Sequence, residues 1–269
     1  MHYTFLYYVI SSLTLCSTAV NYKMFTKYSV TFVKRGPIFS VLTSFRELTM
    51  PGDKKLETAD ELHELFSDPE RLKNYRYSQP VISDTVDNEK FHLDLPFDEI
   101  KAIVESCRDK FFAAVPEGER SGLKWEHVGS TSIKGMPGTM MPDSLIIVPE
   151  FPPSKGVIQA LLNCDYYFSS TAALDPKDLW WMHIFTDGLL KDHKLVLHIV
   201  TEDNVAAKIL RETRDMCNTE EWAFEDYKEA KMSAYRDASG EFKNYKIGKG
   251  KNSKLLTMLR EKYSSSKQQ

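Results

Sequence analysis

The most informative stretch of this chain runs from Glu126 to Val148 and reads EHVGSTSIKGMPGTMMPDSLIIV. The segment Lys124–Val128 predicts a short strand, and the apolar run Ser144–Val148 is typical of a buried strand. A Gly-Ser turn and a short glycine-rich segment join the two, and an acidic residue heads the second strand.

This connection has the composition of an anion-binding turn. Gly129 lets the backbone turn tightly, so that successive N–H groups and the hydroxyls of Ser130 and Thr131 can face an anion. Asp143, at the start of the second strand, could hold a magnesium ion that bridges phosphate oxygens. The arrangement suits a nucleoside triphosphate, although a tight turn with a Ser/Thr helix cap would use the same residues.

The elements on either side of this stretch predict an α/β (α+β) domain. Apolar residues at helical spacing predict helices, and segments rich in aromatic and β-branched residues predict strands. The predicted helices are 98–115, 155–164, 204–216, 220–236 and 252–262, and the further strands are 179–185 and 194–200, an antiparallel pair. We therefore expect a mixed sheet packed with helices and a helical C-terminal part.

The N-terminal third divides into two segments. Residues 50–96 predict an arm in which Thr58 and Glu61 have capping-box spacing at the start of a short helix, 58–66. Three prolines break the polar segment 67–96, which predicts an extended structure that lies against the main domain, 97–263. We expect residues 264–269 to be disordered.

Residues 1–49 leave three interpretations open. The stretch 1–46 contains no acidic residue, which is typical of a mitochondrial transit segment. A weak signal peptide is the second interpretation, and upstream sequence that is not translated in the working protein is the third, because Met50 precedes the first globular sequence. The apolar run Tyr3–Leu15 is shorter than the roughly 20 residues of a membrane span.

Composition restricts the classes of partner. Among 269 residues, a net charge of −3 creates no general attraction to nucleic acid or to an anionic membrane. The four cysteines are far apart and form no CxxC pair, so we expect free thiols rather than a zinc ribbon or a disulfide framework. We expect a cytoplasmic protein, with the mitochondrion as the alternative if residues 1–46 act as a transit segment; the oligomeric state is not predicted.

The order of the motifs resembles the GrpB-like family of the nucleotidyltransferase-fold superfamily. His127 begins a run similar to the family's His, apolar residue, Gly-Ser-Thr signature, and an Asp-headed strand follows. Downstream, the similar motifs are LHIV at 197–200, LRE at 210–212, and two Tyr-x-x-x-Lys pairs, Tyr227 with Lys231 and Tyr245 with Lys249. The resemblance covers residues 97–263 and implies the same fold.

The residues and the resemblance together imply a set of roles. Asp143 and His198 are the expected catalytic residues, and Asp143 is the expected ligand of Mg²⁺. The expected phosphate contacts are Gly129, Ser130, Thr131, Arg211 and Lys249, and the expected pocket residues are His127, Lys231 and Tyr245. His127 and His198 both lie in predicted strands near the proposed pocket, and two converging histidines favour a substrate or metal contact over a purely structural role.

Departures from the family pattern leave two main hypotheses. Nucleotidyltransferases carry Asp-x-Asp or Asp-x-Glu on the second strand, whereas Asp143 is followed by Ser144-Leu145. The enzyme hypothesis is metal-dependent nucleotidyl transfer to a small molecule or protein. The alternative is a non-catalytic module that binds a nucleotide or a phosphorylated metabolite. RNA contact through the basic stretch Lys243–Lys254 is a third interpretation, less favoured than a solvated loop, and that stretch does not match a P-loop.

Overall fold

A computed structural model describes residues 54–77, 91–92, 94–172, 175–238 and 242–264 of the chain. The predicted extension 1–49 lies outside these residues, as does the predicted tail apart from Ser264, which ends a helix. The proposed domain boundaries stay a prediction. Within the described part of the chain, no helix is both long enough and apolar enough to cross a membrane.

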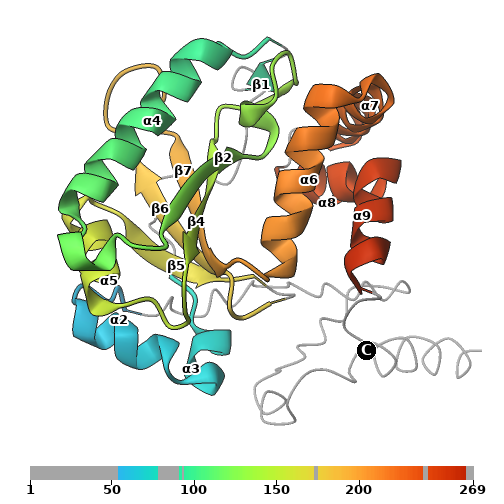
Figure 1. The fold of residues 1–269 in the computed structure, drawn as a ribbon. Helices are drawn as coiled ribbons and strands as arrows, with labels where there is room; N and C mark the ends of the chain where they lie inside the picture. The colour runs from blue at the N-terminus through green and yellow to red at the C-terminus, as the bar shows by residue number, and fades with distance from the viewer. Residues whose placement is uncertain (1–53, 78–90, 93, 173–174, 239–241, 265–269) are drawn as a thin grey trace, which may run out of the picture. The chain divides into compact units, whose positions relative to one another are not determined.

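The centre of the fold is a mixed sheet of five strands in the order β2-β4-β7-β6-β5 (Figure 1). The strands are β2 (Lys124–Val128), β4 (Asp143–Val148), β5 (Tyr167–Thr171), β6 (Leu179–Ile184) and β7 (Lys194–Thr201). Strands β4 and β7 pair in parallel, and the other neighbours are antiparallel, including the predicted pair β6 and β7. The predicted fold class is confirmed.

Three helices cover one face of the sheet and form the larger core. They are α2 (Ala59–Phe66), α4 (Phe97–Ala114) and α5 (Lys155–Asn163). The apolar stripe of α4 is buried, and Trp181 of β6 has no exposed surface at the centre of this core. The predicted helix 58–66 is confirmed together with its capping box between Thr58 and Glu61.

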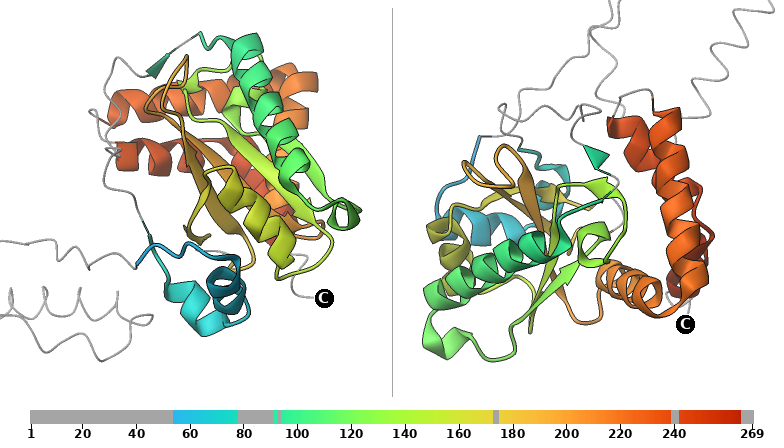
Figure 2. Two further views of the ribbon diagram at one scale, coloured as in Figure 1. Left: turned by 90° about the vertical axis from the view of Figure 1, so that its left-hand side faces the viewer. Right: turned by 90° about the horizontal axis from the view of Figure 1, so that it is seen from above.

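The C-terminal helices lie on the opposite side, where the first of them packs on the sheet and the other three pack on that helix and on one another (Figures 1 and 2). They are α6 (Val205–Thr219), α7 (Glu221–Asp237), α8 (Phe242–Lys251) and α9 (Lys254–Ser264). Ala207 of α6 packs on Val128, Leu145 and Val200 of the sheet. The Asp226 carboxylate of α7 accepts hydrogen bonds from the first residues of α9, which fixes the last helix.

Two helices form in segments for which no regular structure was predicted. The first is α3 (Pro69–Asn74), inside the segment predicted to be extended. Asp68 caps it by accepting from the backbone N–H groups of Glu70 and Arg71, and Pro69 occupies the first turn, where a proline favours a helix. The prediction treated Pro69 as a break, whereas it starts a helix.

The second is α8, where a solvated basic loop was predicted. Gly248 brings this helix close to α7, because a Cβ at Gly248 would lie 2.9 Å from the Cβ of Ala234. The glycine that suggested a loop is therefore a helix-packing residue. Strand β5 was also not predicted; its Ser169 carbonyl accepts from the N–H of Tyr77, which joins the N-terminal segment to the sheet.

We expect Phe66→Ala to lower the free energy of unfolding by about 3–5 kcal/mol, because Phe66 is 2% exposed and its ring lies 4.9 Å from that of Phe168. Urea unfolding measures the change. Trp222→Ala, at a side chain that is 48% exposed, is the control and should change it by no more than about 0.5 kcal/mol. Equal effects would show that α2 is not part of the core.

Candidate functional site

Strand register determines which predicted residues meet. Asp143 lies opposite Val128 and Val196, and His198 lies opposite Leu145 and Trp180. Since side chains alternate along a strand, Asp143 and His198 lie on the face covered by α6. The two residues expected to be catalytic therefore lie on the same face of the sheet.

A second carboxylate, Asp178, completes this part of the site. It is 1% exposed and lies 3.0 Å from Nδ1 of His198, while Nε2 of His198 lies 4.0 Å from Asp143. Burial alone would lower the pKa of His198. The charge of Asp178, the hydrogen bond that its carboxylate accepts from His198, and the charge of Asp143 outweigh burial and raise that pKa. His198 is therefore held between two carboxylates in an orientation set by Asp178.

Asp178 was missed in the sequence. Its signal is the same as that of Asp143, an aspartate directly before an apolar strand, but no motif singled it out.

Gly129 is in direct contact with Asp143. Its φ of 71° lies in the left-handed region, and a Cβ there would be 2.4 Å from Oδ2 of Asp143. The short 3-10 helix η4 (Ser130–Ser132) follows, and its own hydrogen bonds use the N–H groups of Ser132 and Ile133. An anion at this turn would therefore have to meet donors other than these two N–H groups.

Lys231 of α7 supplies such a donor. The residue is 1% exposed, and its Nζ has no hydrogen bond or ion pair with any described residue. Both Nζ of Lys231 and Oγ of Ser130 lie beside Gly138 of β3 (Gly138–Thr139), at 3.3 and 3.0 Å from the position that a Cβ would take. Ser130 and Lys231 thus both pack close to the backbone of Gly138, which a side chain at residue 138 would prevent.

The surroundings of Lys231 are unusual for a buried cation. Its Nζ lies 5.3 Å from the ring of Tyr227 and 5.8 Å from that of Tyr245, and Lys249 Nζ lies 5.6 Å from the same Tyr245 ring. Burial, followed by the charge of Lys249, lowers the pKa of Lys231 well below its ordinary value. Both Tyr-x-x-x-Lys pairs therefore meet in one cluster, and a buried ammonium without an acidic partner is costly.

His127 and Thr131 do not belong to the group formed by Asp143, His198 and Asp178. Register places His127 opposite Ser144, on the face covered by α4, so the structure does not bring it together with His198. Nε2 of His127 lies 2.9 Å from Oγ1 of Thr131, which is 1% exposed. Burial, with the charges of Arg214 and Lys101, lowers the pKa of His127 to about 4.

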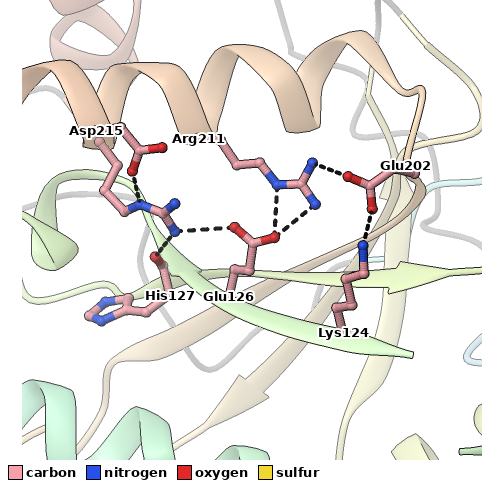
Figure 3. Close-up of polar contacts among 7 residues, drawn as sticks. Lys124, Glu126, His127, Glu202, Arg211 and Asp215 are labelled. Atoms are coloured by element: carbon pink, nitrogen blue, oxygen red, sulfur yellow. Dashed lines mark hydrogen bonds and ion pairs between the residues drawn. The ribbon is translucent and has the colours of Figure 1, made fainter. Parts of the chain in front are cut away.

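Arg211 is engaged by two carboxylates. It binds Glu126 and Glu202 at 2.7 Å each, and Arg214 of the same helix binds the other oxygen of Glu126 (Figure 3). The His127 ring points away from this network in Figure 3, as the predicted alternation with Glu126 requires. The cation of Arg211 is thus neutralised in the structure, and the geometry gives no support to its predicted contact with phosphate.

The donor set does not fit a resident magnesium centre. Among the residues that the structure describes, no three acidic, histidine or cysteine side chains gather in a group that could hold a metal ion. Asp143 offers carboxylate oxygens with its side chain 32% exposed, but those of Asp178 are directed to His198. Of the cysteines, Cys107, Cys164 and Cys217 are free, as predicted.

We expect Gly129→Ala to destabilise the protein more than Gly188→Ala, by about 1–3 kcal/mol in urea unfolding. Both glycines have a positive φ, but a Cβ at Gly188 meets nothing within 4 Å, whereas at Gly129 it meets Asp143. The matched pair separates backbone strain from the clash. In an Asp143→Gly background the excess cost should disappear; a cost that persists would contradict the contact.

Comparison with known proteins gives a consistent result. The family model described as GrpB protein matches residues 96–257. A crystal structure of the conserved protein GrpB from Enterococcus faecalis is similar at 16% sequence identity and a TM-score of 0.47, covering 64% of this chain and 98% of that one. A search of curated protein sequences found no match. Because the family model spans more than half of the chain, this protein is a member of the GrpB family.

Proposed function

We propose that this protein binds the phosphate group of a nucleotide or another phosphorylated small molecule at Lys231, Ser130 and Gly138. The observation that carries the proposal is the buried Lys231 ammonium, which forms no ion pair with a described residue, although the charge of Asp143 acts on it, and which lies with the Ser130 hydroxyl beside Gly138. A phosphate oxygen would supply the missing counter-charge through charge-assisted hydrogen bonds.

Neighbouring groups support an anion at this place. Lys249 adds a second positive charge beside Lys231, since both ammonium groups lie against the ring of Tyr245. The absence of a side chain at Gly138 lets Ser130 and Lys231 lie close to its backbone. Thr131 and Arg211, by contrast, have partners of their own and are not needed in this binding site.

Replacing the buried ammonium tests the proposal. Wild-type protein with pyrophosphate at about 100 times its Kd should gain about 2.7 kcal/mol of stability. Lys231→Met should lose this gain, yet be at least as stable as wild type without ligand, because it removes a buried unpaired charge. Lys228→Met, on the exposed side of the same helix, is the control and should keep the gain.

The proposal also predicts that the affinity for the anion depends on pH, because Lys231 titrates. An anion that stabilises the ammonium raises its lowered pKa, so binding takes up a proton and the affinity rises as the pH falls. Calorimetry in buffers of different protonation enthalpy measures the uptake. Gly138→Ala, which adds a side chain there but keeps the charge, should also prevent binding. Unchanged binding in both variants would exclude this site.

Nucleotidyl transfer is a second candidate function, favoured by the Asp178–His198–Asp143 arrangement. An acceptor oxygen would attack the α-phosphorus, the bond to pyrophosphate would break, and Nε2 of His198 would take the acceptor's proton. Magnesium would enter as part of the nucleotide substrate, beside Asp143, rather than as a resident ion.

Pyrophosphate release from each nucleoside triphosphate with Mg²⁺ tests transfer. We expect His198→Gln to reduce the rate by about 10²-fold or more, because it loses the proton acceptor. Asp143→Ala should also reduce it, whereas Asp203→Asn, at an exposed turn, should not. Equal release from wild type and Asp143→Ala would remove Asp143 from the mechanism, and no release from wild type would leave binding as the function.

A further inference from the structure

A separate hollow of about 270 Å³ lies on the other face of the sheet, between α4, β2 and α6. It is lined by residues of all three elements, among them Phe97, Trp125 and Arg214. Ser132 also lines it, so the 3-10 helix η4 has this hollow on one side and, through Ser130, Lys231 on the other. None of the roles proposed above uses it.

The charge of the lining is predominantly positive. Lys101 and Arg108 of α4 contribute cations, against the carboxylate of Glu105, while Arg214 of α6 is already paired with Glu126 and Asp215. Lys101 has no ion pair with any residue that the structure describes, and Arg108 is paired only with its neighbour Asp109 there. Burial lowers the pKa of His127, and the charges of Arg214 and Lys101 lower it further.

A buried donor without an acceptor lies in the same lining. Nε1 of Trp125 is buried and donates no hydrogen bond to any described residue. A buried N–H without a partner costs free energy, which a ligand acceptor would recover. The rings of Trp125 and Phe97 and the side chain of Val104 add apolar walls beside these polar groups.

We propose that this hollow is a second binding site, for a small organic anion with an apolar body and one carboxylate or phosphate group. The apolar part would lie against Phe97 and Trp125, and the anionic group would meet Lys101, which has no ion pair with a described residue. A pocket with apolar walls and a few converging polar groups is the usual form of a small-molecule site. The inference does not depend on the phosphate site at Lys231.

Nuclear magnetic resonance of the ¹⁵N-labelled full chain tests it through the indole N–H signals. Trp125→Phe identifies the signal of Trp125 among the four tryptophans. Benzoate and phenyl phosphate serve as probes with the two head groups, and benzamide is the uncharged probe of similar shape. We expect at least one of the anions to move the Trp125 signal and benzamide to leave it in place; whichever anion does so identifies the head group.

Charge variants sharpen the test. Lys101→Gln should raise the Kd of the active probe by about tenfold, because one charge-assisted contact is lost. Lys110→Gln, an exposed lysine of the same helix outside the hollow, should leave the Kd unchanged, and Glu105→Gln should lower it.

Three results would overturn the inference: no movement of the Trp125 signal, equal movement with benzamide, or equal effects of the two lysine variants. Movement confined to Trp180, whose ring lies 5.5 Å from that of His198, would report binding at the other site instead. Failure here is thereby distinguished from failure of the proposed function.

Discussion

The parallel pairing of β4 with β7 is the constraint on which the candidate site depends. This register places Asp143 and His198 on the same face of the sheet, and the antiparallel β6 then brings Asp178 behind His198. A shift of one residue would move every side chain of a strand to the other face, so the apolar packing of both faces also holds the polar residues in place. The apolar cores therefore determine the geometry of the polar site.

The C-terminal helices add what the sheet alone lacks. Helix α7 carries Lys231 over the connection between β2 and β4, and α8 holds it there through the close contact of Gly248 with Ala234. The helices thereby bury a cation that has no acidic partner among the described residues. Buried charges are costly, and this cost is the physical basis for proposing an anionic ligand.

The two faces of β2 have different environments. Glu126 faces α6, where two arginines neutralise it, while Trp125 and His127 face α4 and the positively charged hollow. The ion-pair network of Glu126 is drawn in Figure 3, and the hollow is lined by Trp125 and His127 on the other side of the strand. Arg211, which the family motif suggested for phosphate, is paired with Glu126 and Glu202 in this network.

Local patterns in the sequence determined the family and most helices and strands. They also placed Gly129 and Ser130 in a turn, and Asp143 and His198 on strands. Periodicity and glycine-containing turns are properties of neighbouring residues, so the sequence alone reveals them. The tertiary structure alone decided that His127 faces away, that Asp178 orients His198 and that Lys231 is buried without a carboxylate. It also decided that α8 is a helix, since contact with α7 outweighs its glycines. These outcomes depend on strand register and helix packing between distant segments, which no local pattern encodes.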